Sequence, residues 1–388
     1  MEGIEPSAAA GATEEELRSG AAKEADFAVR LFRRCFDAEK NTLVSPLSVL
    51  SALAMTANGA KGETLAEMEK TLGMSTNELN AYFKSMLERI RAEEGDTFRF
   101  HLANSVWFTS DERFTVNRDF LQTNADYYGA DVYRAPFDDT TLAAINGWVN
   151  ENTDGMIPSI LDRIPADALM YLVNALAFEA EWPEPYDEYQ VYPGDFTLED
   201  GTKRKVDFMH SEESRYLEDG DAAVGFVKNY KGGKYAFAAL LPKAGRSLSD
   251  YVASLDGEKL IDILSSSEIC TVNAALPKFE VEFSDDLAEA LGDMGMSAAF
   301  GPQADFSGLG TSTGGNISIT RVLHKTFISV AEQGTRAGAA TVVEMNDGCA
   351  PEFEEPKYVT LDRPFVYMLI DRETNVPFFI GTLTDPEK

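Results

Sequence analysis

One short motif in this sequence contains the residue types of a hydrolase active site. Gly310, Ser312 and Gly314 match G-x-S-x-G, a pattern that places a nucleophilic serine on a sharp turn between a strand and a helix. Here a loop rich in Gly, Ser and Thr surrounds the motif, and the strand-like stretch ISITRVL follows it. This context predicts no nucleophile. The sequence also lacks a phosphate-binding loop, an H-E-x-x-H pair and a C-x-x-C pair, so we expect a protein that is not an enzyme.

The cysteines and histidines are spread too widely to predict a metal site. There are three of each: Cys35, Cys270 and Cys349, and His101, His210 and His324. Cys35 and Cys270 lie in apolar stretches and are expected to be small buried residues, whereas Cys349 falls in a loop. Three cysteines cannot form a disulfide framework, and a zinc site requires clustered ligands. We expect no metal and no cofactor.

Acidic residues dominate the charge of the chain. The 65 Asp and Glu residues outnumber the 34 Lys and Arg residues, which gives a net charge of -31. Nucleic acids and heparin-like polyanions bind to basic patches, so neither is an expected partner. Hydrophobic residues make up 44% of the 388 residues, which is enough for a large core. We expect a monomer.

The apolar stretches and the N-terminal residues of the sequence say little about where the protein is located. No stretch approaches eighteen uninterrupted apolar residues, so we expect no membrane span. The first residues, MEGIEPSAAAGATEEEL, contain no basic region followed by an apolar one, so they do not form a signal peptide. Residues 1–24 are expected to form a flexible tail and the start of the first helix.

The segment from Glu332 to Met345, EQGTRAGAATVVEM, is compatible with two different structures. Alternate residues of one parity are small or β-branched and uncharged: Thr335, Ala337, Ala339, Thr341 and Val343. A strand would turn that parity towards a core and leave Arg336 and Glu344 outside. The Gly and Ala content instead favours a loop, and the turn-prone residues 346–356 extend it. Such a long connection is usually functional or disordered.

The order of the expected elements indicates an α+β fold in one domain. Helices are expected mostly first, and the later part is rich in strands, which favours antiparallel sheets. The expected helices are 14–36, 41–58, 64–72, 75–94, 118–128, 140–153, 248–265 and 285–294. The expected strands are 98–108, 168–181, 194–208, 224–230, 236–241, 271–283, 317–332, 358–360, 365–371 and 378–383. We find no fixed-period repeat and no linker that would divide the chain.

Six segments, taken in order, resemble sequences of the serpin family. The first includes a Ser-Pro-x-Ser motif at Ser45–Ser48, and the last resembles the C-terminal signature of the family. The matches fall in order from about residue 25 to the end of the chain. The six segments are Asn41–Thr64, Ile145–Leu161, Leu172–Trp182, Leu276–Gly308, Ile317–Val343 and Asp362–Pro386.

This resemblance implies a serpin-like fold of three β-sheets and eight to nine helices, with a single domain over residues 25–388. It also implies an exposed reactive-centre loop at about residues 332–357. In inhibitory serpins a serine protease attacks this loop and forms an acyl-enzyme. The loop then inserts as a strand of the central sheet, and distortion of the protease stalls deacylation.

Several residues match positions to which the family assigns roles in insertion. The implied hinge of the loop contains Glu332, Gly334, Thr335, Ala337, Gly338, Ala339 and Ala340. The implied shutter, beneath the strands that open, contains Ser45, Ser48, Asn174 and His324. The implied breach, where the loop enters the sheet, contains Trp182, Lys278 and Glu332, and we expect Lys278 to pair with Glu332.

By family convention the scissile residue is found by counting seventeen positions from Glu332, which predicts cleavage after Gly348. A shift of one position predicts cleavage between Cys349 and Ala350. Pro351 disfavours cleavage after Ala350, and Met345–Asn346 is a weaker alternative. The span from Gly334 to Pro364 is several residues longer than the family pattern, so the count defines the scissile residue only to within a few positions. No Lys or Arg lies between Thr341 and Pro356, so a trypsin-like target is disfavoured. Small residues favour elastase-like or subtilisin-like proteases.

The resemblance also implies a partner and a location. The partner is a target serine protease held in a covalent acyl-enzyme complex. The expected location is extracellular or on the cell surface, with any leader absent from this chain and the cytoplasm as the alternative. The alternative function is a non-inhibitory serpin with a binding, storage or chaperone role.

Overall fold

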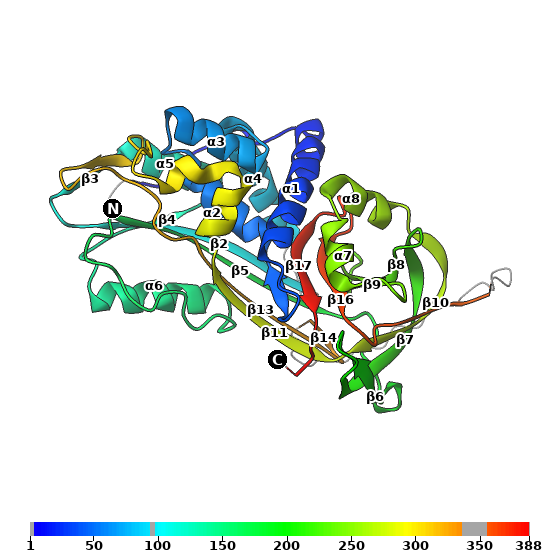
Figure 1. The fold of residues 1–388 in the computed structure, drawn as a ribbon. Helices are drawn as coiled ribbons and strands as arrows, with labels where there is room; N and C mark the ends of the chain where they lie inside the picture. Colours follow the sequence, from blue (N-terminus) through cyan, green and yellow to red (C-terminus); the bar gives the residue numbers. More distant parts are fainter. Residues whose placement is uncertain (1–3, 94–97, 336–354, 388) are drawn as a thin grey trace.

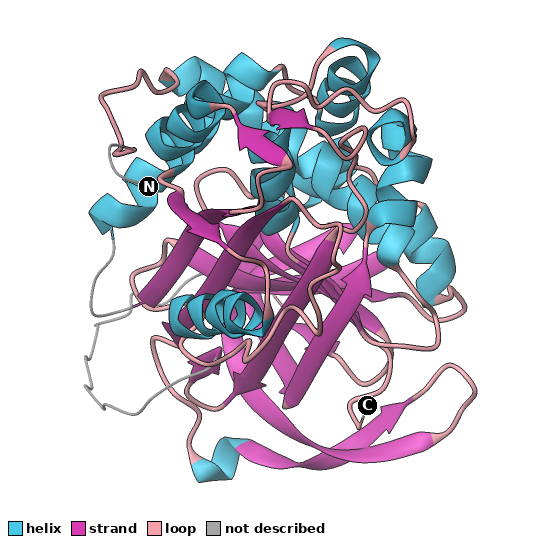
Figure 2. Cartoon of the chain, turned by 90° about the vertical axis from the view of Figure 1, so that its left-hand side faces the viewer, coloured by secondary structure: helices cyan, strands magenta, loops and turns pink. Residues whose placement is uncertain are grey.

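The structure, a computed structural model, describes residues 4–93, 98–335 and 355–387. Part of the expected hinge and all candidate scissile residues lie outside these ranges, namely Ala337, Gly338, Ala339, Ala340, Met345, Gly348, Cys349 and Ala350. The described ranges contain nine α-helices and three sheets, as the α+β expectation required. The helices gather mainly at one end of the molecule, and the strands run through its middle (Figures 1 and 2).

The helices follow the order in which the sequence predicts them. Their bounds are α1 Glu14–Cys35, α2 Pro46–Ala57, α3 Gly62–Leu72, α4 Thr76–Glu93, α5 Arg118–Tyr128, α6 Asp139–Asn152, α7 Leu248–Ala253, α8 Gly257–Ser265 and α9 Ala288–Leu291. Helix α1 begins with a capping box in which Thr13 and Glu16 bond each other's backbone N–H groups. Helix α2 begins with Ser45 as N-cap and Pro46 in the first turn, and almost all of it is buried.

The strands form a six-stranded sheet, a nine-stranded sheet and a small pair. The six-stranded sheet has the order β11-β13-β14-β5-β2-β4, the larger one has the order β1-β17-β16-β9-β8-β7-β10-β15 with β6 on β7, and β12 pairs with β3. The bounds are β1 Thr42–Val44, β2 Phe98–Thr109, β3 Phe114–Val116, β4 Asp131–Ala135, β5 Met170–Glu181, β6 Val191–Thr197, β7 Lys203–Asp219, β8 Ala223–Asn229, β9 Tyr235–Pro242, β10 Glu268–Pro277, β11 Phe279–Asp286, β12 Gly310–Ser312, β13 Leu323–Ala331, β14 Gly334–Thr335, β15 Lys357–Thr360, β16 Phe365–Asp371 and β17 Pro377–Leu383.

Several expected elements have different limits in the structure. The strand expected over 317–332 begins only at Leu323, and the helix expected over 248–265 is divided into α7 and α8. The strand expected over 271–283 is divided at Lys278 into β10 and β11, which belong to different sheets. These predictions were wrong at their boundaries because apolar periodicity continues across a change of sheet or a short break between helices.

The six-stranded sheet is covered on both faces. Helix α6 lies across one face (Figure 2), where Trp148 and Val149 pack with Val173 and Ala175 of β5. The other face of β5 contributes Leu176 and Phe178 to the main core. Because side chains alternate along a strand, both faces of the middle of β5, residues 173–178, are buried, whereas partly exposed residues occur at both of its ends.

Candidate functional site

A two-residue strand, β14, forms the entrance to the candidate site. Gly334 and Thr335 pair with Glu181 and Ala180 of β5 on one side and with Ala331 and Val330 of β13 on the other. At Gly334 φ is +152°, and a Cβ there would lie 2.0 Å from the carbonyl oxygen of Ala180. Glycine is therefore required at the point where the chain turns between the two strands.

Thr335 is already placed in the core of the protein. Its side chain is buried, and its hydroxyl forms a hydrogen bond with the hydroxyl of Tyr230. Complete burial raises the pKa of Tyr230, so this phenol stays protonated. Trp182 stacks on the Tyr230 ring with the centroids 4.6 Å apart and the planes 5° from parallel. The expected hinge thus starts on an aromatic platform, the stacked rings of Trp182 and Tyr230.

The turn before β14 is held by backbone acceptors. The indole Nε1 of Trp182 donates to the carbonyl oxygen of Ala331 at 2.9 Å. The backbone N–H groups of Trp182 and Tyr186 donate to the carbonyl oxygens of Gln333 and Glu332 at 2.9 and 3.0 Å. Three consecutive carbonyl groups are therefore fixed by two aromatic residues, of which sequence reasoning identified only Trp182.

The expected ion pair at this entrance is present. Lys278 Nζ lies 2.6 Å from Glu332 Oε1, and both side chains are about one-third exposed. Partial burial raises the pKa of Glu332, but the hydrogen bond from Lys278, a backbone hydrogen bond and the charge of Lys278 together outweigh it and hold the pKa below its usual value. Lys278 lies between β10 and β11, so the pair connects the turn before β14 to the junction of two sheets.

Below Thr335 the six-stranded sheet contains a slot between β5 and β13. Among the described residues, β5 pairs only with β2 and β14, and β13 pairs only with β11 and β14. Small cavities lined by both strands follow the slot, one next to Thr335 and one next to Asn174 and His324. At its lower end a cavity of about 570 Å³ lies between β5 and residues 312–324. The slot therefore continues the line of β14.

A polar network crosses the middle of the slot. Ser48 Oγ donates to Asn174 Oδ1 at 2.5 Å, and Asn174 Nδ2 donates to Asn104 Oδ1 at 2.9 Å. Asn104 in turn donates to the carbonyl oxygen of Tyr128 at 3.0 Å. The structure thus brings Ser48 and Asn174 together. Sequence reasoning missed Asn104, although an Asn within the apolar stretch FRFHLANSVWF is a signal that could have identified it.

His324 belongs to the same region of the slot, on β13. Its Nε2 accepts a hydrogen bond from the backbone N–H of Ser45 at 3.0 Å. Burial lowers the pKa of His324 to about 4, so the ring is neutral near pH 7. A neutral imidazole can accept at Nε2, whereas an imidazolium cannot. His324 is therefore a structural acceptor that connects β13 to the start of α2.

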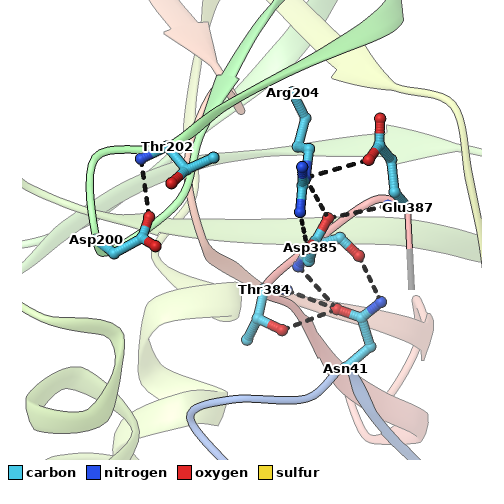
Figure 3. A network of polar contacts seen from close by, with 7 residues as sticks. All are labelled: Asn41, Asp200, Thr202, Arg204, Thr384, Asp385 and Glu387. Atoms are coloured by element: carbon cyan, nitrogen blue, oxygen red, sulfur yellow. Dashed lines mark hydrogen bonds and ion pairs between the residues drawn. The ribbon is translucent and has the colours of Figure 1, made fainter.

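The chain that follows the loop is anchored in the body of the protein. β16 and β17 are buried throughout. Beyond them, Asn41 Oδ1 accepts hydrogen bonds from the backbone N–H groups of Thr384 and Asp385, and Arg204 pairs with Asp385 and Glu387 (Figure 3). A cut between residues 335 and 357 would therefore leave the C-terminal part attached.

The other candidate features give no separate site. Gly310–Ser312 forms strand β12 and a turn follows, so the nucleophile motif does not precede a helix. Within the described residues there is no group of His, Cys, Asp and Glu suited to a metal ion. Burial raises the pKa of Cys35 to about 12, which makes its thiol unreactive. None of the described helices is both long and apolar enough to cross a membrane.

Comparison with known proteins gives a consistent result over the whole chain. The sequence model of the family described as Serpin (serine protease inhibitor) matches residues 22–386. An uncharacterised serpin-like protein of Thermococcus kodakarensis is 31% identical and the match covers 93% of this chain and 84% of that protein. For the leukocyte elastase inhibitor of Bos taurus the identity is 30%, over 89% of this chain and 93% of the relative.

Among solved structures, the thermophilic serpin tengpin in its native state is 43% identical to this chain. The match has a TM-score of 0.90 and covers 98% of this chain and 97% of tengpin. Tengpin in its latent state, at 42% identity, matches with a TM-score of 0.85 over 97% of this chain and 99% of that structure.

Proposed function

The chain belongs to the serpin family, and on that premise we propose that it is a suicide-substrate inhibitor of serine proteases. Most members of the family inhibit serine proteases, and a serpin acts on its target as an inhibitor and not as an enzyme. The proposal concerns what is particular to this chain: how its loop inserts, where it is cut and which class of protease it traps.

The slot between β5 and β13 is the observation that carries this proposal. Thr335 pairs with Ala180 and Val330 at the top of the slot. Continuing that antiparallel register along β5 would pair residue 345 with Met170, where β5 begins. The segment 334–345 therefore matches β5 in length, and on the other side the same register would pair residue 342 with Leu323, where β13 begins.

The same register supports the parity of the inserted residues. Continued along β5, it sets Ala337 opposite Phe178 and Ala339 opposite Leu176, two residues that face the main core. Thr341 would then stand opposite Asn174, where a hydroxyl can join the polar network. The uncharged parity enters the core, and Arg336 lies on the opposite parity. Arg336 would stand opposite Glu179, whose side chain is 21% exposed, so its charge would lie at the partly exposed end of that face and opposite a carboxylate.

In the proposed mechanism the target protease attacks the loop at Gly348–Cys349 or Cys349–Ala350, with Met345–Asn346 as the less favoured bond. The serine of the protease forms an ester with the carbonyl carbon of the cut residue, and the new amine leaves on the C-terminal part. Insertion of residues from Gly334 onwards then carries the acylated protease along the sheet. Distortion of the protease prevents water from hydrolysing the ester.

The small residues around the bond favour elastase-like or subtilisin-like targets, because no cation is present for an acidic specificity pocket. The name of the bovine relative, leukocyte elastase inhibitor, is in line with that choice. We assign the hinge, shutter and breach residues the roles that the family implies. The proposal includes a monomeric inhibitor in an extracellular or cell-surface location, with the cytoplasm as the alternative.

A denaturing gel with a panel of proteases tests the proposal. Elastase, subtilisin and trypsin would each be incubated with the protein, alongside the same proteases inactivated at the catalytic serine. We expect a covalent band with elastase or subtilisin and none with the inactivated enzymes. Cleavage by every protease without any covalent band would contradict inhibition and favour the non-inhibitory alternative.

A further inference from the structure

A buried ion pair lies next to the hinge platform, and no step of the mechanism described so far uses it. Lys228 on β8 and Glu213 on β7 are 2.7 Å apart, and their side chains are only 8% and 11% exposed. Burial lowers the pKa of Lys228, but the attraction and hydrogen bonds of Glu213 and Tyr186 together outweigh it, so the pKa lies above its ordinary value and the ammonium stays charged. A buried pair of this kind is a poor source of stability, because desolvation opposes its attraction.

The ammonium group of Lys228 also lies against two aromatic rings. Its Nζ is 5.0 Å from the ring centroid of Trp182 and 4.7 Å from that of Tyr186. Desolvated cation–π contacts of this kind are stronger than exposed ones. On the other side, Ser211 Oγ donates to Glu213 Oε1 at 2.6 Å and lies 3.0 Å from the hydroxyl of Tyr186. One ion pair therefore fixes both rings.

These two rings belong to the residues that hold the hinge. Trp182 and Tyr186 bind the carbonyl oxygens of residues 331–333. Trp182 also stacks on Tyr230, whose hydroxyl contacts Thr335. A continuous series of contacts thus leads from the ion pair to the first inserted residue.

We propose that Lys228 and Glu213 are positioning residues for strand insertion. They hold Trp182 and Tyr186 in place, and through them the hinge, in the register from which residues after Thr335 add to β5 and β13. Fixing a residue costs conformational entropy. A hinge that is already fixed removes this cost from the first step, so insertion competes better with hydrolysis of the acyl-enzyme. This inference rests on the proposed function.

The inference predicts that loss of the ion pair changes the rate of insertion in the opposite direction to simple destabilisation of the native state. Loss of a stabilising contact elsewhere in a metastable native state would speed insertion, because the barrier to rearrangement falls. Loss of the ion pair should slow insertion, because the hinge then has to be ordered first. The rate of insertion therefore separates a positioning role from a merely structural one.

The test compares variants after a cut within residues 336–354 by a metalloprotease, which forms no acyl-enzyme. Tryptophan fluorescence follows insertion over time, and the thermal unfolding midpoint records its completion. Lys228→Met should slow insertion about tenfold, the size expected for a lost desolvated cation–π contact. Lys228→Arg, which keeps the charge over both rings, should restore most of the rate.

Two further variants serve as controls. Lys259→Met breaks the pair of Lys259 with Asp219, 2.8 Å apart and with side chains 30% and 15% exposed, which has no contact to the hinge residues named above. It should not slow insertion. Ser211→Ala removes the link between Tyr186 and Glu213 without leaving an unpaired charge, and it should also slow insertion. It tests the inference even where Lys228→Met fails to fold.

The outcomes distinguish the inference from the proposed function. If the cut wild-type chain gains stability but both Lys228→Met and Ser211→Ala insert at the wild-type rate or faster, the positioning role is wrong and the inhibitory mechanism stands. If the cut wild-type chain gains no stability at all, the proposed function fails and the positioning role fails with it.

Discussion

The hydroxyl of Thr335 forms a hydrogen bond with that of Tyr230 beneath the indole of Trp182. The first inward-facing residue of the expected hinge is therefore buried in the intact chain. Among the described residues, no strand continues β14 between β5 and β13. In the proposed mechanism, filling of the slot by the residues after Thr335 releases energy that drives the trapping of the protease.

A charge at the hinge should block trapping but not cleavage. Thr335→Arg would place a guanidinium at a buried position beside the neutral phenol of Tyr230, at a cost of several kcal/mol. We expect the protease to cut the loop at a normal rate, with the covalent fraction reduced by a factor of about ten or more. Gln333→Arg is the matched control, since Gln333 is exposed. Equal covalent bands for the two variants would contradict the role of Thr335.

Breaking the pair between Lys278 and Glu332 should ease spontaneous insertion of the uncut loop. The pair is partly exposed, so solvent screening limits it to about 0.2–1 kcal/mol, or up to about fivefold in rate. Lys278→Met should therefore lose inhibitory activity on storage up to several times faster than the wild type. Lys325→Met, which breaks the pair with Glu282 on the neighbouring strands, is the control. An unchanged rate for Lys278→Met would count against the pair as a restraint on the hinge.

His324 should make the stability of the native state depend on pH. Its pKa is about 4 in the folded protein and 6.5 in the reference state, so the unfolded chain binds the proton more readily. The contribution of neutral His324 to the free energy of unfolding is present in full above pH 6.5. It is lost as the pH falls from 6.5 towards 4, by up to about 3 kcal/mol.

Urea unfolding at several pH values measures this effect. His324→Gln should flatten the pH dependence between pH 4 and 6.5, whereas His101→Gln should leave it as in the wild type. If both variants keep the full slope, the buried imidazole is not its source.

The identity of the scissile residue should decide the class of target. Mass spectrometry after incubation with elastase is expected to find a C-terminal peptide beginning at Cys349 or Ala350. Cys349→Arg supplies a cation for an acidic specificity pocket and should create a covalent complex with trypsin. Cys349→Ser, which stays small and neutral, should not. A peptide beginning elsewhere would move the specificity site.

Much of the fold could be predicted because it follows from local patterns. The apolar periodicity predicts helices over 14–36 and 41–58, and the structure has α1 at Glu14–Cys35 and α2 at Pro46–Ala57. The alternation in Glu332–Met345 identifies a segment that is acceptable as loop and as strand. These signals depend on neighbours in the sequence, and so a single sequence is sufficient to read them.

The contacts that build the site could not be predicted in the same way. Lys228 lies in the stretch GFVKNY, which suggests a strand with an exposed lysine, yet its charge is buried between Glu213 and two rings. Asn104 bonds Asn174 because β2 and β5 pair in one particular register. Such contacts join residues that are distant in the sequence, and their geometry is decided by tertiary packing. The resemblance to serpins supplied Lys278 and Glu332 but not these partners.

The thermal unfolding midpoint before and after a single cut within residues 336–354 tests the central claim most directly. Filling the slot adds a strand with hydrogen-bond partners on both sides, so the account predicts that the cut chain unfolds on the order of 10 °C or more above the intact one. The C-terminal part should remain bound, because β16 and β17 are buried. An unchanged or lower midpoint would contradict insertion of the loop.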